Sequence, residues 1–150
     1  PDIDYVVVEK QDEGEGDFVR FIVAQEKLEE IFGKDDYKVV EEKKGKNLIG
    51  KSYKPLFDYY KDADLTTCTG EAAGRDKAWK IYGADFVTTE EGTGIVHIAP
   101  AFGSDDLELA RKEGLPIIQH ISMNGEIKPE ATDFAGLSAK PKDDPTATDV

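Results

Sequence analysis

The sequence contains little cysteine, little histidine and no long run of apolar residues. Cys68 is the only cysteine among 150 residues, so no internal disulfide can form and a reducing compartment is expected. The two histidines, His97 and His120, form no recognised metal-ligand pair with Cys68, which argues against a zinc site. No stretch approaches the roughly 20 apolar residues of a membrane span, and no signal segment opens the chain. These absences predict a cytoplasmic protein without membrane contact or bound metal.

Positive charge is also scarce. The 19 Lys and Arg are outnumbered by 32 Asp and Glu, which gives a formal net charge of −13. A broad grip on a phosphate backbone needs several clustered cations, so we expect no strong autonomous binding to nucleic acid. Residues 43–47, KKGKN, are basic and are expected to form a solvated loop. The first residue is Pro1 rather than Met, which predicts a mature product or an excised piece.

Short β-rich segments dominate the first half of the chain. Residues 5–9 and 18–23 are β-branched and aromatic, and the acidic, glycine-bearing link between them predicts a hairpin. Residues 24–32 carry apolar side chains at helical spacing and are followed by Gly33, so a short helix is predicted. Residues 37–42 predict another strand.

The second half alternates loops with further candidate strands. Gly50 and Pro55 predict an irregular or bent strand over residues 48–57, and residues 61–77 lack periodicity and predict a long loop. Asn124-Gly125 is a strong hairpin turn. Further strands are predicted from β-branched and aromatic residues at 78–88, 94–99, 115–122 and 126–128. The whole predicts a β-rich, barrel-like α+β fold with short helices, a single domain over residues 1–139 and a frayed tail over 140–150.

The stretch GTGIVHIAPAFGSDD, residues 92–106, concentrates the candidate functional side chains. Pro100 is expected to end a strand, and Gly103 to bend the chain into a helix that Ser104 or Asp105 caps. Asp105 with Glu108 fits the capping-box pattern, and the helix dipole favours both aspartates in a first turn, so the pattern alone requires no ligand. Two interpretations stay open: His97 and the aspartates converge at one strand-to-helix edge, or the aspartates only start a helix and His97 is a half-exposed strand residue.

Other chemistries lack their sequence patterns. There is no GxSxG elbow or Ser-His-Asp order, and Gly92-Thr93-Gly94 lacks the rest of a phosphate loop. His120 is expected at the surface of a strand rather than in a catalytic role. Trp79 and Tyr82 are expected in the core.

Nearly the whole chain resembles the editing domains of isoleucyl-tRNA synthetases, of the type shared with the valyl and leucyl enzymes. The matching segments are ADFVTT, GTGIVHIAPAFGSDD, GLPII and DFAGL, with PDIDYVVVE and LIGKSYKPLFDY favouring the isoleucyl branch. The resemblance implies hydrolysis of mischarged Val-tRNA(Ile), and of valyl-adenylate before transfer. A synthesis pocket cannot strongly reject valine, which lacks only one methylene, a limit for which isoleucyl-tRNA synthetase is the standard example.

The resemblance also implies a role for each candidate residue. Asp106, the second aspartate of the GxDD motif, binds the α-ammonium group of the substrate, and His97 lies in the amino-acid pocket. A carboxylate committed to an ammonium is a poor general base, so no residue is assigned as the base; hydroxyls, including the vicinal ribose hydroxyl, position the water. The remaining residues line the edge of the site (Gly92, Thr93 and Gly94) or support it (Pro100, Gly103, Ser104 and Asp105).

The implied partner is the acceptor end of tRNA(Ile) carrying misattached valine, held by the full synthetase. No cofactor is implied in this domain, since ATP and Mg are used by the synthesis domain, whose HIGH-like and KMSKS-like motifs lie outside this chain. A threonine-rich peptide of the family, expected just before PDIDYVVVE, is also outside it, so we expect half of the site here. The alternatives are a folded but inactive fragment with at most weak ligand binding, and an unrelated acidic interaction domain.

Overall fold

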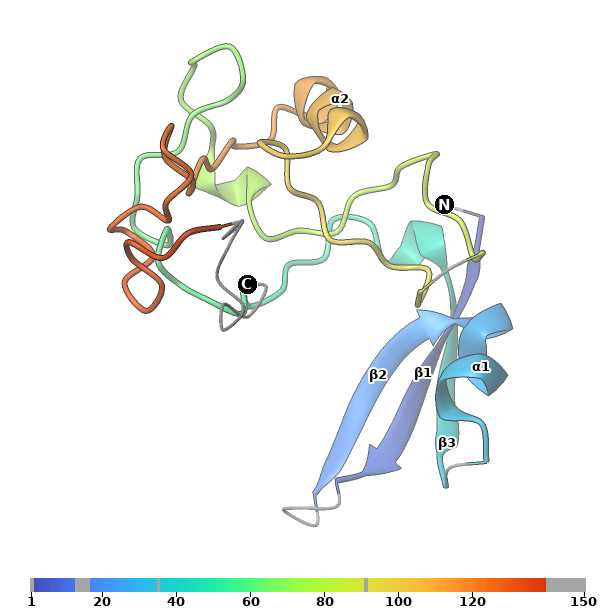
Figure 1. The fold of residues 1–150 in the computed structure, drawn as a ribbon. Coiled ribbons are helices and arrows are strands. Elements are labelled where there is room, and N and C mark those ends of the chain that lie inside the picture. The colour runs from blue at the N-terminus through green and yellow to red at the C-terminus, as the bar shows by residue number, and fades with distance from the viewer. Residues whose placement is uncertain (1, 13–16, 35, 91, 140–150) are drawn as a thin grey trace. The chain divides into compact units, whose positions relative to one another are not determined.

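The computed structural model describes residues 2–12, 17–34, 36–90 and 92–139 (Figure 1). The chain forms two compact units, each built from two segments. Unit 1 contains Pro1–Tyr53 and Trp79–Ile98, and unit 2 contains Lys54–Ala78 and Ala99–Val150. The single domain predicted over residues 1–139 stays a prediction. The predicted frayed tail lies outside the described residues.

Unit 1 is built on a three-stranded antiparallel sheet in the order β2-β1-β3, with β1 at Asp4–Gln11, β2 at Phe18–Ala24 and β3 at Lys38–Lys44. The strands contain the β-branched residues from which they were predicted, so the hairpin and the third strand are confirmed. The sheet is open: β2 and β3 each pair only with β1. The predicted barrel is therefore wrong for the described residues, because three strands are too few to close a sheet on itself.

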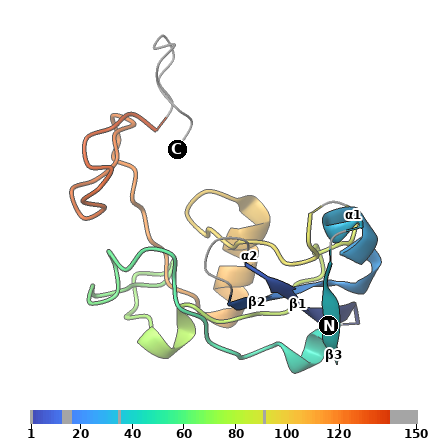
Figure 2. The ribbon, with the colours of Figure 1, turned by 90° about the horizontal axis from the view of Figure 1, so that it is seen from below.

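A short helical segment covers one face of this sheet (Figures 1 and 2). It consists of a 3-10 turn, η1 at Gln25–Lys27, and α1 at Leu28–Phe32. Gly33 ends it with a φ of 54°, a conformation that glycine adopts without strain, as the sequence predicted. The buried core under the helix combines side chains of β1, β2 and α1: Val6, Val8, Val23 and Phe32.

A second core lies on the opposite face of β1 from the first. Tyr5 and Ala24, paired across β1 and β2, pack with Leu48, which follows the 3-10 turn η2 at Gly45–Asn47. Ile81 packs against this group, and its N–H donates to the carbonyl of Lys51 at 2.9 Å. Residues 48–57 are irregular, as predicted, with one isolated bridge between Ser52 and Lys80.

The strands predicted at residues 78–88 and 94–99 are wrong. These residues form no named strand, and Trp79 has a φ of 51°, the only positive value among the described non-glycine residues. Gly94 also has a left-handed φ, of 77°. β-branched composition favours a strand only where a partner supplies hydrogen bonds to its backbone, and Ile95 and Val96 are 43% and 50% exposed.

Unit 2 has one longer helix, α2 at Ser104–Glu113, and the 3-10 turn η3 at Arg75–Lys77 within a largely irregular chain. The predicted long loop at residues 61–77 is confirmed apart from η3. The strands predicted on either side of Asn124-Gly125 reduce to isolated bridges, including Ile121 with Ile127. The turn itself is present, since the Ser122 N–H donates to Glu126 at 2.8 Å and Gly125 has a φ of 84°.

An aromatic group stabilises unit 2. Phe57 stacks on Tyr59 with ring centroids 5.3 Å apart, and Phe134 meets both rings edge-on. The Tyr59 hydroxyl donates to the Asp133 carboxylate at 2.7 Å. Among the described helices of both units, none is long and apolar enough to cross a membrane.

Candidate functional site

Asp106 holds the loop that leads into α2. Its Oδ2 accepts a hydrogen bond from the backbone N–H of Ala99 at 3.0 Å, so the carboxylate reaches back across the turn before the helix. Gly103 makes this possible: a Cβ at that position would lie 2.7 Å from Oδ2 and 3.0 Å from Cγ of Asp106. The Gly of the GSDD motif is therefore required by the Asp that follows three residues later.

The start of α2 differs from the predicted cap. The N-cap residue is Gly103, and no side chain caps the helix there, so neither Ser104 nor Asp105 serves as N-cap. Asp105 instead lies in the first turn with Asp106, and its side chain is exposed. The capping-box pattern fails because the hydrogen-bonding carboxylate is Asp106, which pairs with a residue before the helix. A sequence pattern cannot distinguish two adjacent aspartates by the partner that the chain brings to them.

The geometry leaves Asp106 free to bind a cation. One carboxylate oxygen is fixed by Ala99, and no other bond to the side chain is present within the described residues, so Oδ1 can accept further hydrogen bonds. The half-buried side chain lies in the first turn of α2, where the helix dipole favours negative charge. A fixed carboxylate of this kind suits an ammonium group, with which it forms a charge-assisted hydrogen bond.

The turn between Ala99 and Gly103 presents an aromatic side chain, that of Phe102. Pro100 lies in this turn, where the N–H groups of Phe102 and Gly103 both donate to the Ala99 carbonyl. Pro100 ends no strand, since the strand predicted before it is absent. The Phe102 ring is 50% exposed and contacts the His120 imidazole, with ring centroids 4.7 Å apart.

His120 makes a contact that the sequence did not reveal. It was predicted on the surface of a strand, but its side chain is half-buried against Phe102. Burial lowers the pKa of His120 below its ordinary value of 6.5, with Lys128 lowering it further and the Ile118 backbone opposing both. Nothing in the local sequence pairs His120 with a residue 18 positions earlier, so only the fold identifies this contact.

The Gly92-Thr93-Gly94 turn is fixed to the sheet of unit 1. The Thr93 carbonyl accepts from the Ala24 N–H at 2.8 Å, and the Gly94 carbonyl accepts from the Tyr5 hydroxyl at 2.6 Å. Gly94 has no room for a side chain, because its Cβ would lie 2.6 Å from that of Ala24. These contacts determine the conformation of the glycine turn.

Lys27 is a second residue that the sequence did not reveal, and it is the one buried charged side chain found among the described residues. Its Nζ donates to Glu30 at 2.6 Å and to the Glu90 carbonyl at 2.9 Å. Thr89 adds a bond from its hydroxyl to Glu26 at 2.8 Å. Two side-chain hydrogen bonds thus join the loop before the glycine turn to η1.

His97 follows the glycine turn and is exposed. It is not part of a strand, so the alternation argument for its direction does not apply. His97 belongs to unit 1 and Asp106 to unit 2. The predicted convergence of His97 with the aspartates stays a prediction.

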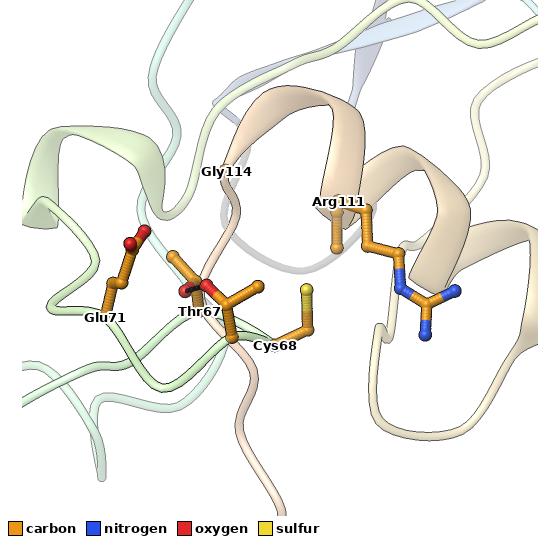
Figure 3. A pocket seen from close by; sticks show the side chains of 7 residues that line it. Thr67, Cys68, Glu71, Arg111 and Gly114 are labelled. Atoms are coloured by element: carbon orange, nitrogen blue, oxygen red, sulfur yellow. Dashed lines mark hydrogen bonds between the residues drawn. The ribbon is translucent and has the colours of Figure 1, made fainter.

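A separate open cavity of about 210 Å³ lies at the other end of α2 (Figure 3). Thr67, Cys68 and Glu71 line one side, and Arg111 and Gly114 the other. The cavity is at the helix C-terminus, whereas Asp106 is in the first turn of this ten-residue helix. Across the described ranges, no group of three or more His, Cys, Asp and Glu side chains is arranged to hold a metal ion.

Comparison with known proteins identifies a family whose matching segment includes the GSDD motif. Residues 66–140 match the family described as the leucyl-tRNA synthetase editing domain. The isoleucine–tRNA ligase of Treponema denticola is 36% identical over 148 residues, which is 95% of this chain and 13% of the relative. The corresponding ligase of Bdellovibrio bacteriovorus is 36% identical over 151 residues, 99% of this chain and 13% of the relative.

A more distant match has the same name. The isoleucine–tRNA ligase of Corynebacterium efficiens is 33% identical over 141 residues, 91% of this chain and 12% of the relative. The chain thus spans about one eighth of the length of these curated relatives. Asp106, His97 and the glycine turn all lie inside the segment that matches the editing-domain family. This chain belongs to the editing-domain family of the aminoacyl-tRNA synthetases, and it resembles the isoleucyl enzymes.

Proposed function

We propose that this chain is the editing part of an isoleucine–tRNA ligase and hydrolyses the ester that joins misattached valine to tRNA(Ile). The observation that carries the proposal is the Asp106 carboxylate, which is fixed by Ala99 and lies within the family match. In this proposal Oδ1 accepts from the α-ammonium group of the valyl ester. The contact orients the ester carbonyl, and positioning of this kind lowers the entropic part of the barrier.

Water is the nucleophile in the proposed reaction. It attacks the ester carbonyl, the bond to the ribose oxygen breaks, and that oxygen takes up a proton to leave the tRNA with a free terminal hydroxyl. Asp106 does not accept the water proton, because one oxygen is bonded to Ala99 and the other to the ammonium. The vicinal ribose hydroxyl positions the water. We assign His97 to the amino-acid pocket, where the larger isoleucyl side chain is excluded by shape.

Substitutions at Asp106 test the role of its charge. Asp106→Asn keeps an oxygen that accepts from the Ala99 N–H but cannot form an ion pair with ammonium. We expect release of valine from Val-tRNA(Ile) to slow by about 10- to 150-fold, the equivalent of the 1.5–3 kcal/mol of a hydrogen bond to a charged group. Asp105→Asn is the matched control, since Asp105 is the exposed residue directly before Asp106 in α2. An active chain whose deacylation rate is unchanged by Asp106→Asn contradicts the assignment.

A second candidate is a folded but catalytically inactive fragment of the editing domain, with at most weak ligand binding. The open sheet, in which β2 and β3 pair only with β1, favours it. Valine release is therefore measured with the chain as it stands and with the family's threonine-rich peptide joined to its N-terminus. Activity only in the extended chain supports the family mechanism and the incomplete fragment together. Absence of activity in both contradicts the proposed hydrolysis.

A further inference from the structure

One part of this acidic chain has the opposite charge. Residues 43–51, KKGKNLIGK, contain four lysines and no acidic residue, whereas the whole chain has a net charge of −13. We call residues 43–51 the basic turn. It begins at the end of β3, passes through η2 and ends beside the segment that contains Ile81.

The basic turn is held in place by unit 1. The Gly45 N–H donates to the Ile3 carbonyl at 2.9 Å, and the Gly50 N–H donates to the Ile81 carbonyl at 2.8 Å. Leu48, between them, is 2% exposed and packs with Tyr5 and Ala24. The lysines therefore project from a fixed backbone, which reduces the ordering cost of binding a ligand.

Two of the four lysines form close ion pairs, and two do not. Lys43 pairs with Glu41, and Lys44 pairs with Asp4 through side chains that are each about half exposed. Lys46 and Lys51 are exposed and form no ion pair with any residue that the structure describes. The Lys51 ammonium also attracts the Glu41 carboxylate, without a close ion pair. Two exposed ammonium groups on an anchored turn form a local surface for an anionic partner.

We propose that the basic turn binds the sugar-phosphate backbone of the tRNA acceptor end; this inference rests on the proposed function. Lysines act as point charges toward phosphates without regard to base sequence. Tyr53 lies two residues after Lys51 and is 49% exposed. An exposed aromatic ring two residues from a lysine in the chain suits single-stranded nucleic acid, whose bases stack on such rings, better than it suits an acidic peptide.

The proposal accounts for how an acidic domain approaches a polyanion. The overall charge of −13 repels phosphates, but at about 0.15 M salt the repulsion from charges more than about 8 Å away is largely screened. A phosphate in contact with Lys46 or Lys51 is then attracted mainly by that lysine. The basic turn supplies a weak local contact and no broad grip.

Binding to an RNA hairpin with a single-stranded ACCA 3′ end tests the proposal. Fluorescence anisotropy measures its Kd with the chain between 50 and 200 mM KCl. The variant Lys46→Glu/Lys51→Glu is compared with Lys61→Glu/Lys112→Glu, which makes the same change in net charge at exposed lysines outside the basic turn. Loss of two phosphate contacts reduces the slope of log K against log salt by about 1.4–1.8. Between 50 and 200 mM KCl, the loss of affinity should therefore be about tenfold smaller for the basic-turn variant than for the control variant.

At 50 mM KCl we also expect the basic-turn variant to bind at least tenfold more weakly than the control variant. Equal affinities and equal salt slopes for the two variants overturn the proposal, as does a wild-type chain that does not bind the hairpin at 50 mM KCl. A poly-glutamate peptide that binds the wild-type chain as tightly as the RNA also overturns it, because the surface then recognises anionic peptides.

Two ester substrates separate this inference from the proposed function. Hydrolysis of 3′-valyl-adenosine, which has no phosphate, is expected to be the same in the basic-turn variant and the wild type. Hydrolysis of Val-tRNA(Ile) at subsaturating concentration falls in that variant alone. A wild-type chain that hydrolyses neither ester contradicts the proposed function, while the RNA binding measurements still decide the inference.

Discussion

Replacing Gly103 by alanine places a methyl group where the structure holds the Asp106 carboxylate. The new Cβ would lie 2.7 Å from Oδ2 and 3.0 Å from Cγ, closer than ordinary van der Waals contact. The backbone itself tolerates alanine, since Gly103 has a φ of −124°. Asp106 must therefore move, and its 3.0 Å bond to the Ala99 N–H is lost or weakened.

The expected cost has two parts. A hydrogen bond to a charged group contributes about 1.5–3 kcal/mol, and alanine is a poorer N-cap than glycine by about 0.5–1 kcal/mol. Gly103→Ala should therefore lower the free energy of unfolding by about 2–4 kcal/mol. In an Asp106→Ala background only the N-cap part remains, because there is no carboxylate to displace. The double-mutant cycle then gives a coupling energy of about 1.5–3 kcal/mol.

Urea unfolding followed by circular dichroism measures all four members of the cycle. Gly74→Ala is a matched control, because its Cβ would lie 2.3 Å from Oδ1 of Asp76, an even closer contact with a carboxylate. Asp76 is exposed and has no hydrogen bond to its side chain in the described ranges, so it can rotate away at a cost below about 1 kcal/mol. A Gly103→Ala cost that is the same with and without Asp106 would refute the proposed coupling.

Three further predictions follow from single contacts. Lys27→Met keeps the apolar stem but removes the donor to the Glu90 carbonyl, so unfolding by urea should become about 1–3 kcal/mol easier, whereas a Lys34→Met control should change little. Burial lowers the pKa of His120, so the folded chain loses stability as pH falls through 6.5 toward that lowered pKa. His120→Gln should remove this part of the loss between pH 7.5 and 5.5. An unaltered pH dependence of the urea midpoint would contradict this prediction. Burial and the bond to Asp133 raise the pKa of Tyr59 from 10.0 to about 12. The contribution of Tyr59 to folding stability is therefore complete below pH 10 and is lost as pH rises toward 12. Tyr59→Phe should abolish that alkaline loss, and ultraviolet titration of the wild type should show one tyrosine that ionises at higher pH than the others.

The residues predicted for the site are divided between the two units. Asp106 and the Phe102–His120 pair belong to unit 2, whereas the glycine turn and His97 belong to unit 1. Each group is fixed within its own unit, by Ala99 in one case and by Tyr5 and Ala24 in the other. Substitutions in one unit therefore test contacts made within that unit, as the Gly103 cycle does for unit 2.

Local sequence determined the elements whose physics is local. The hairpin of β1 and β2 follows from two β-branched runs and the link between them, and α1 ends where Gly33 permits a positive φ. The Ser122–Gly125 turn follows from Asn124-Gly125 in the same way. The GxDD motif and its neighbours also identified the editing-domain family, because an ordered set of residue types survives in the sequence itself.

Tertiary structure decided which backbone groups found partners. Residues 94–99 have strand composition but no strand to pair with, and the sheet stays open because no further described strand pairs with β2 or β3. The sequence predicted a cap at Ser104 or Asp105, and only the path of the chain shows that Asp106 reaches the Ala99 N–H. The contacts of Lys27 and His120 could not be predicted for the same reason. Their partners lie 63 and 18 residues away in the sequence, and a hydrogen bond or ring contact at that separation depends on the fold rather than on the neighbouring residues.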